Sequence, residues 1–232
     1  MRKNTLGQDN IKLSIIIPVL NSHEIVRRQI EHFKKMDLPD DVEIIIVDDG
    51  SDPPLESDDV DIIQTNDTRP WTQPKARNIG ANCATGDVML FTDIDHVIDE
   101  KAVIFGMDFK YDYGRFYREL GILDEDGNLT QDPDELIKWG VPEKKARGDL
   151  HVGCHAMSMY VKSDVFNKTG GFREKLTKHP THDDGDMKRK LNRNGFLKCP
   201  DDERPKIYLI PNGRYTGGKD DNPHGYFHDL CR

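Results

Sequence analysis

The chain has 232 residues, 35% hydrophobic and 32% charged, with a net charge of −9 at pH 7. That charge argues against general nucleic-acid binding, which needs a basic face, but allows a nucleotide whose phosphates a metal neutralises. The four cysteines form no CxxC pair, which argues against zinc and favours reduced thiols. We find no apolar run of the roughly 18 residues that a membrane span needs, and no signal-peptide pattern. We therefore expect a cytoplasmic protein without an integral membrane segment, one that can also lie at a membrane surface.

Two short β-branched runs with a helical pattern between them open the chain. Residues 13–19 and 42–47 are largely apolar, as in central parallel strands covered on both faces, and the spacing of apolar residues predicts a helix between them, up to about residue 36. Pro18 has no N–H to give and is expected to end the first ladder. The loop and helix N-cap candidates that follow are Asn21 and Ser22. This is a βαβ unit.

A second set of elements extends the same pattern. A weaker strand is predicted at 60–65, a short helix of small residues at 75–84, and a buried strand at 88–91. Pro74 can occupy the first turn of that helix. The order β-α-β-β-α-β argues for an α/β/α sandwich on a mostly parallel central sheet.

The rest of the chain has a more mixed pattern. We expect, in order, helical turns at 99–105, an exposed antiparallel strand at 109–117, a hairpin-like turn at 124–128, a helix at 132–139, a polar surface loop at 142–149, a strand at 153–161, a helix at 163–168 that ends at glycines, a helix at 187–194, a strand at 206–210 and a polar tail from 214.

Acidic residues stand where two of the predicted strands end. Asp49 follows the strand at 42–47, and Asp93 and Asp95 follow the strand at 88–91. Ligands of open α/β sheets bind at such carboxyl ends. Two carboxylates can hold a hard divalent cation, which can hold a diphosphate, and Asp49 can accept a hydrogen bond from a nucleobase or ribose. The alternative is a pair of Asp-rich turns that cap helices.

Two further groups of residues have both a functional and a structural interpretation. Arg77 can pair with phosphate or with one of the acidic strand ends, or it can be a surface arginine. The acidic cluster at 182–186 can supply a reactive carboxylate, or it can cap the helix that follows.

Six motifs stand in the order of an inverting, GT-A-fold glycosyltransferase of family 2, which the sequence resembles from residue 13 to about 195. They are SIIIPVLN at 14–21, IIIVDDGS at 44–51, ARNIG at 76–80, GDVMLFTDID at 86–95, VFNKTGGF at 165–172 and DDGDM at 183–187. The stretch 153–186 also resembles β-1,4-galactosyltransferase-type enzymes, in which a histidine beyond the acidic motif completes a metal site. The resemblance implies one GT-A domain over 1–232, with a nucleotide-sugar half at about 11–97 and an acceptor half at about 98–232.

The resemblance also implies site residues. Asp95, together with Asp93, would bind Mn²⁺ or Mg²⁺, and Asp184 would be the catalytic base. His224 or His228 would complete the metal site, the alternative being exposed tail histidines. The implied nucleotide-sugar residues are Pro18, Asn21, Asp49, Arg77, Asn78 and Asp93. The sequence departs from the family where Asp183 replaces Glu, His96 replaces a third Asp, and Lys190 replaces Arg.

These residues imply a metal-dependent inverting transfer of a sugar from a nucleotide-diphospho-sugar, with a UDP-sugar favoured, to a hydroxyl of a glycan acceptor. A metal would stabilise the leaving diphosphate, and a carboxylate would take the proton of the attacking hydroxyl. One alternative is a nucleotidyltransferase on a related scaffold, although the loop at 21–24 lacks the glycine and basic residues of a phosphate loop. Others are a non-catalytic nucleotide-sugar or glycan-binding module and an Asp-rich structural protein.

Overall fold

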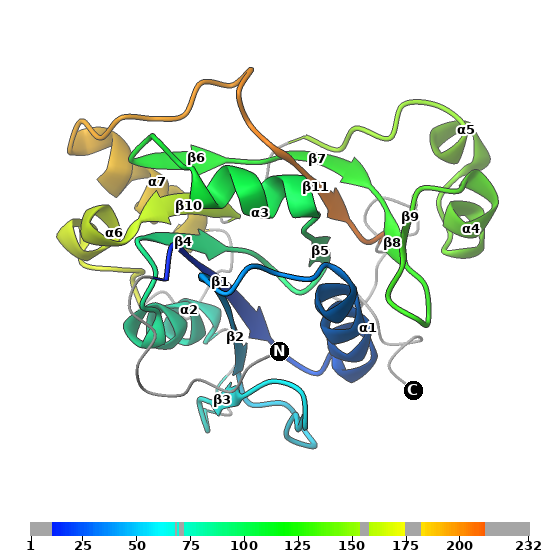
Figure 1. The fold of residues 1–232 in the computed structure, drawn as a ribbon, viewed down its shortest axis with the longest axis horizontal. Helices are drawn as coiled ribbons and strands as arrows, with labels where there is room; N and C mark the ends of the chain where they lie inside the picture. The colour runs from blue at the N-terminus through cyan, green and yellow to red at the C-terminus, as the bar shows by residue number, and fades with distance from the viewer. Residues whose placement is uncertain (1–10, 68, 70–71, 154–157, 175–181, 212–232) are drawn as a thin grey trace.

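A six-stranded sheet forms the centre of the computed structural model, which describes residues 11–67, 69, 72–153, 158–174 and 182–211 (Figure 1). The strand order is β3-β2-β1-β4-β10-β6. The strands are β1 (Leu13–Val19), β2 (Val42–Asp48), β3 (Ile62–Gln64), β4 (Val88–Phe91), β6 (Tyr113–Arg115) and β10 (Met159–Lys162). The first four are parallel, and β10 runs antiparallel to both of its neighbours. The predicted mostly parallel sheet is confirmed.

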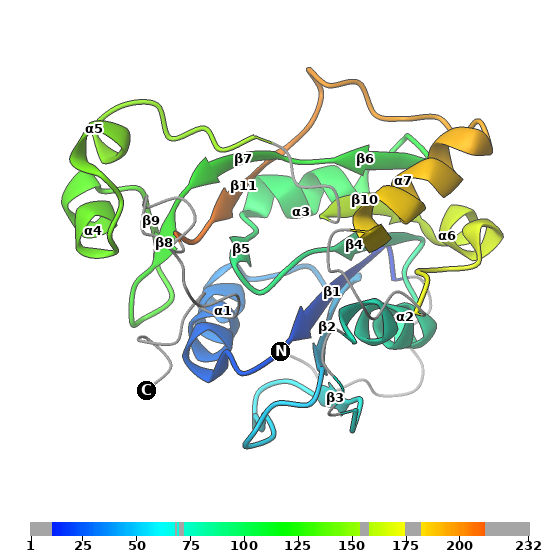
Figure 2. The ribbon, with the colours of Figure 1, turned by 180° about the vertical axis from the view of Figure 1, so that it is seen from behind.

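Helices cover both faces of this sheet. Buried side chains of α1 (His23–Lys35) and α3 (Glu100–Met107) pack on one face. Buried side chains of α2 (Gln73–Cys83), α6 (Ser163–Thr169) and α7 (His182–Arg193) pack on the opposite face, which is turned toward the viewer in Figure 2. All seven residues of β1 are buried because helices lie on both faces, which explains its continuous apolar run. The α/β/α sandwich is the architecture that the element order predicts.

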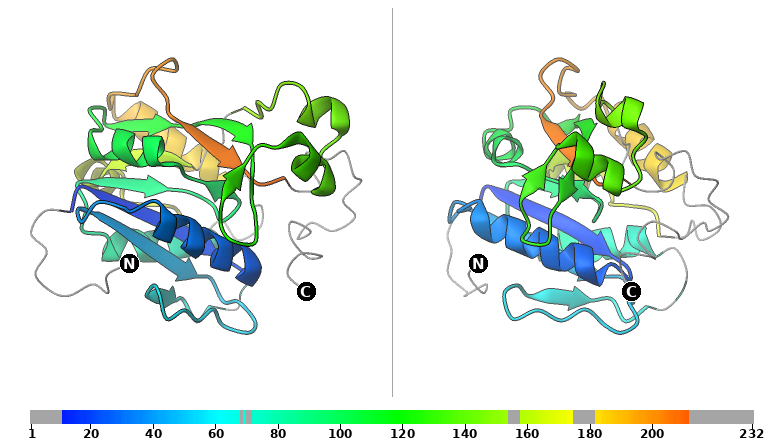
Figure 3. Two further views of the ribbon diagram at one scale, coloured as in Figure 1. Left: turned by 45° about the vertical axis from the view of Figure 1, so that its right-hand side comes forward. Right: turned by 90° about the vertical axis from the view of Figure 1, so that its right-hand side faces the viewer.

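Smaller elements lie beside the main sheet. The strands β5 (His96–Val97), β11 (Lys206–Leu209) and β7 (Tyr117–Leu120) form a second sheet. The hairpin of β8 (Ile122–Leu123) and β9 (Leu129–Thr130) lies alongside α1 (Figure 3). The short helices α4 (Pro133–Lys138) and α5 (Glu143–Ala146) follow it. Within the described residues, we find no helix with the length and apolar character needed to cross a membrane.

The expectation that Pro18 ends the first ladder is wrong on one side of β1. Pairing with β4 stops at Ile16, but pairing with β2 continues through Pro18 to Val19. The carbonyl oxygen of Ile16 accepts from Thr92 N (3.1 Å) and so faces β4. Because backbone polar groups alternate between the two sides of a strand, the N–H that Pro18 lacks would also face β4, where pairing has already ended.

Two expectations for the second half of the chain are also wrong. The segment 109–117 is not one exposed strand: it contributes to β6 and β7, and Phe109 and Phe116 are buried against Tyr160, with ring centroids 5.3 and 4.7 Å from it. The segment 142–149 is not only a polar loop, since it contains α5. Two apolar residues in a polar segment, Val141 and Ala146, anchor that short helix in a small core.

Close packing of α2 on β1 positions the first turn of that helix near the strand ends. A Cβ on Gly80 would lie 2.5 Å from Cγ2 of Ile16, so only glycine allows this approach. The short helix of small residues is confirmed, and it starts at Gln73 with Pro74 in its first turn.

Candidate active site

The loops after β1 and β2 are joined to each other by backbone and side-chain hydrogen bonds. Asn21 N donates to Ser51 Oγ (2.8 Å), and Asn21 Oδ1 accepts from Asp52 N (2.8 Å). Asn21 adopts a φ of 51°, a left-handed conformation that asparagine tolerates better than most residues. Pro18 is buried just before this junction. The side chain of Asn21 therefore joins the two loops at the end of the sheet, and a contact of Pro18 or Asn21 with a nucleotide stays a prediction.

The two adjacent aspartates at the end of β2 have different environments. The carboxylate of Asp48 accepts from the backbone N–H groups of Ser51 (2.9 Å) and Leu55 (2.8 Å), so it fixes the turn. Asp49 accepts from Thr72 Oγ1 (2.7 Å). Burial, opposed by that hydrogen bond, raises the pKa of Asp49 to about 6. A buried carboxylate that accepts one side-chain hydrogen bond from the protein can accept another from a donor on a ligand.

Arg77 is one of the largest fully buried side chains of the molecule, so the interpretation as a surface arginine is wrong. It donates through Nη2 to Asp93 Oδ1, which also accepts from Gln73 Nε2 (3.0 Å). Its guanidinium lies 5.7 Å from the ring centroid of Phe172. Two of its nitrogens, Nε and Nη1, have no hydrogen-bond partner among the described residues. A buried guanidinium with unused donors beside a carboxylate provides positive charge where a phosphate would need it.

The carboxylates of Asp93 and Asp95 lie next to His96, and one ligand atom from each residue falls within 4.8 Å of the others. Arg118 Nη1 lies 3.0 Å from His96 Nε2, and since a guanidinium only donates, Nε2 must accept. The ring hydrogen is therefore on Nδ1, which faces Asp95 Oδ1 at 3.4 Å and Ser158 Oγ at 3.2 Å. Burial lowers the pKa of His96 to about 4, so the ring is neutral.

This set fits a hard divalent cation, for which the two half-buried carboxylates are the appropriate donors. The imidazole of His96 is hydrogen-bonded at both nitrogens. Arg118 and Ser158 therefore fix the ring of His96, with its Nδ1 3.4 Å from Asp95 Oδ1, next to the carboxylates that would bind the metal.

Asn78 uses its side-chain amide within the protein. Its Oδ1 accepts from Phe172 N (2.8 Å), and its Nδ2 donates to Phe172 O (2.9 Å) and to Glu174 Oε1 (2.8 Å). These bonds tie α2 to the loop after α6. A contact between Asn78 and a nucleotide stays a prediction.

The predicted base and the third predicted metal ligand fall at the limits of the described residues. Asp184 lies in the first turn of α7, although its side chain is outside the described part. His224 and His228 lie outside the described residues altogether. Their roles stay predictions.

Sequence reasoning missed four residues that support the site: Thr72, Gln73, Arg118 and Ser158. Gln73 stands at the start of α2, four residues before Arg77, and that spacing is a signal that could have found it, whereas Thr72 is the residue at the N-cap of the same helix. Arg118 comes from β7 and Ser158 directly precedes β10, and no local pattern connects them to His96.

Comparison with known proteins concerns the family and the fold. Residues 14–107 match the family described as Glycosyl transferase family 2. A search of curated proteins gives no match. The fold is the GT-A fold of glycosyltransferases, and residues 14–107 are similar to family 2. The predicted resemblance to that family is confirmed, whereas the findings give no confirmation of a resemblance to β-1,4-galactosyltransferase-type enzymes.

Solved structures with the same fold include those of two proteins. TarS of S. aureus, residues 1–349 in complex with UDP, is 19% identical with a TM-score of 0.53, and the match covers 88% of this chain and 62% of that one. The mannosyltransferase PcManGT from Pyrobaculum calidifontis, in complex with GDP-Man and Mn²⁺, is 13% identical with a TM-score of 0.54, covering 89% and 59%. TarS 1–349 with UDP-GlcNAc is 18% identical with a TM-score of 0.53, covering 94% and 64%. This chain thus spans less than two thirds of each of these structures.

Proposed function

We propose that this chain is a metal-dependent, inverting glycosyltransferase that moves a sugar from a UDP-sugar to a hydroxyl of a glycan acceptor. The observation that carries the proposal is the convergence of Asp49, Arg77, Asp93 and Asp95 at one edge of the sheet, within the family 2 segment. The similar structures whose titles name UDP, UDP-GlcNAc and GDP-Man support a nucleotide-sugar donor.

Asp49 would bind the nucleoside. Its carboxylate is buried, accepts from the hydroxyl of Thr72, and would line a nucleoside pocket, where it can accept from the N–H of a uracil or from a ribose hydroxyl. Pro18 and Asn21 would form the wall of that pocket, because the loop that they begin is bonded to the loop after β2.

Asp93 and Asp95 would hold Mn²⁺ or Mg²⁺, which when bound stabilises the negative charge of the leaving diphosphate as a Lewis acid. Arg77, which is buried and paired with Asp93, would add positive charge that stabilises the same diphosphate. His96 would keep the carboxylate of Asp95 in place through its Nδ1 hydrogen, with Arg118 fixing the tautomer.

Asp184 would act as the base. It lies at the start of α7, where the positive end of the helix favours a carboxylate over the neutral acid. The acceptor oxygen would form a bond to the anomeric carbon while the bond from that carbon to the diphosphate breaks. The hydroxyl proton would pass to Asp184, and one in-line displacement inverts the configuration.

The test is calorimetric binding of UDP, GDP and CDP, each with and without Mn²⁺, to the parent chain and to Asp95→Ala. Asp126→Ala, a change of the same kind on an exposed residue of the hairpin turn, is the control. We expect metal-dependent binding of UDP that Asp95→Ala loses and the control keeps. A folded parent that binds no nucleotide would refute the assignment of the donor site.

Two further measurements separate the alternatives. Asp184→Asn should bind the donor normally and lose transfer of sugar, whereas a non-catalytic module would show no turnover in the parent. A nucleotidyltransferase would instead release pyrophosphate from a nucleoside triphosphate.

A further inference from the structure

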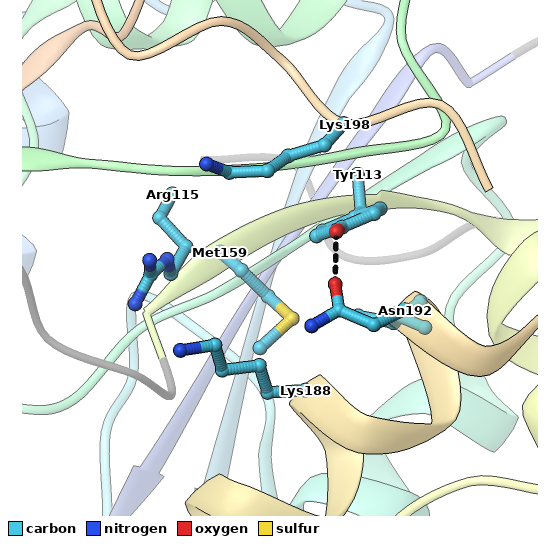
Figure 4. Close-up of a pocket in the computed structure, with 7 residues that line it drawn as sticks. Tyr113, Arg115, Met159, Lys188, Asn192 and Lys198 are labelled. Carbon is cyan, nitrogen blue, oxygen red and sulfur yellow. Dashed lines mark hydrogen bonds between the residues drawn. The ribbon is translucent and has the colours of Figure 1, made fainter. Parts of the chain in front are cut away.

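A cavity of about 150 Å³ opens between the β6–β10 edge of the sheet and α7 (Figure 4). Its floor is apolar and buried, made of Tyr113, Met159 and Leu191. The hydroxyl of Tyr113 donates to Asn192 Oδ1 (2.6 Å), which leaves the amide nitrogen of Asn192 turned toward the cavity. The cavity is about five times the volume of one water molecule, enough for a small polyatomic group.

Three cationic side chains surround this floor: Arg115, Lys188 and Lys198, which together we call the cationic rim. Figure 4 shows their charged ends gathered on the same side of the cavity. Lys198 is paired with Asp201 (2.7 Å). Arg115 and Lys188 have no ion pair or side-chain hydrogen bond among the described residues. In a chain with a net charge of −9, two unpaired cations beside a third create a local positive field that attracts an anion.

The cavity lies next to the candidate active site on the side away from the β2 loop. Met159 pairs across the sheet with Arg115 and directly follows Ser158, whose hydroxyl contacts His96. Lys188 lies one helical turn after Asp184 in α7, about 6 Å along the helix axis. The cationic rim and the predicted base therefore lie on adjacent turns of one helix.

We propose that this cavity is an acceptor subsite that binds an oxyanion, either a phosphate or a carboxylate, carried by the acceptor near its reactive hydroxyl. The inference rests on the proposed glycosyl transfer and adds to it the charge of the acceptor. The fork of Arg115 suits a bidentate oxyanion, Lys188 supplies a point charge, and Asn192 can add an amide donor. The apolar floor would receive the carbon skeleton next to the anion.

The test uses glycerol 1-phosphate as the phosphate probe, glucuronate as the carboxylate probe, and uncharged glucose as the reference. Each is titrated by calorimetry at low ionic strength into the parent and into the double variant Arg115→Gln, Lys188→Gln. We expect one or both anions to bind the parent, glucose not to bind, and affinity for the anion to fall at least about tenfold in the double variant. Which anion binds distinguishes a phosphorylated acceptor from an acidic sugar.

The matched control is Lys101→Gln with Lys144→Gln, which removes the same charge from two exposed helical lysines outside the cavity. The control should bind the anion as the parent does. Equal losses in both double variants, or no binding of either anion to the parent, would overturn the subsite. Competition between the anion and a saturating UDP–Mn²⁺ complex would also overturn it, because the rim would then belong to the donor site.

Donor binding separates this inference from the proposed function. UDP–Mn²⁺ should bind the double variant at Arg115 and Lys188 with parental affinity, which also shows that the variant is folded. A parent that binds the anion but no nucleotide would overturn the proposed function and the acceptor role with it. A parent that binds UDP–Mn²⁺ but no anion would overturn the subsite alone.

Discussion

Replacing Asp49 by asparagine is expected to stabilise the folded chain at neutral pH, although the residue lies in the candidate active site. Burial raises the pKa of Asp49 from its ordinary value of 3.8 to about 6. A carboxyl group whose pKa is raised by folding contributes stability that is fully present below the unfolded pKa and is lost as the pH rises through the folded pKa. At pH 7.5 the buried Asp49 of the parent is ionised, so the parent has lost that contribution to stability. An asparagine carries no charge at any pH, so the variant does not lose it.

The shift of roughly 2 pH units corresponds to about 3 kcal/mol. We therefore expect Asp49→Asn to raise the free energy of unfolding, measured with urea at pH 7.5, by about 2–3 kcal/mol. The gain should shrink to roughly half at pH 5 and nearly vanish at pH 4, because the parent is then increasingly protonated as well. Affinity for UDP–Mn²⁺ should fall in the same variant if Asp49 accepts a hydrogen bond from the nucleoside.

Asp48→Asn is the matched control, because the neighbouring carboxylate is equally buried but accepts from two backbone amides. An asparagine there offers one oxygen where two donors need acceptors, so we expect a loss of about 1–3 kcal/mol. If Asp49→Asn destabilises the chain at pH 7.5 as Asp48→Asn does, or if its effect does not depend on pH, the reasoning about Asp49 is refuted.

Three further predictions concern packing, the support of the metal site and helix capping. Gly80→Ala should cost about 1–3 kcal/mol in urea unfolding, because its Cβ has no room above β1; a stabilised variant would contradict the packing. Arg118→Met should weaken Mn²⁺ binding in the presence of UDP about 10-fold or more, because His96 loses the partner that fixes its tautomer; an unchanged affinity would exclude that support. Asp132→Ala should lower the free energy of unfolding by about 1 kcal/mol, since its carboxylate accepts from two amides at the start of α4. Ser22→Ala should lower it less, because the hydroxyl of Ser22 makes no capping bond to α1. Thermal denaturation compares the two variants, and equal losses of stability would refute the distinction.

The central sheet and the position of the site could be predicted from the sequence because their signals are local. Runs of β-branched residues gave β1, β2 and β4 nearly to the residue. The rule that ligands bind at the carboxyl ends of parallel strands then placed Asp49 and the Asp93–Asp95 pair on one edge. The hairpin turn and the cap of α4 by Asp132 also follow from short patterns.

What the sequence could not predict depends on contacts between distant segments. Arg118 reaches His96 only because β7 and β5 both pair with β11, and no pattern in either segment encodes that sheet. Arg77 can be buried because its guanidinium pairs with Asp93 at the end of β4 and lies near the ring of Phe172 in the loop after α6. Propensity suggests an exposed arginine on a short helix, and tertiary packing overrides it.

The path of the chain between β4 and β10 has a consequence for folding. After Phe91 the chain pairs with β4 again only at Met159, and β6, which lies within this excursion, joins the sheet through β10. Pairing of β4 with β10 closes this long excursion, and the pairing of β1 with β4 joins residues at least as far apart in the chain, so both pairings are non-local and slow to form. Because the cost of closure rises only slowly with length, residues can be added within the excursion at little thermodynamic penalty. The two ends of the excursion are nevertheless fixed to each other at the site, where His96 meets Ser158. Insertions in this excursion can therefore change the surface beside the candidate site while the aspartates at the ends of β2 and β4 keep their places.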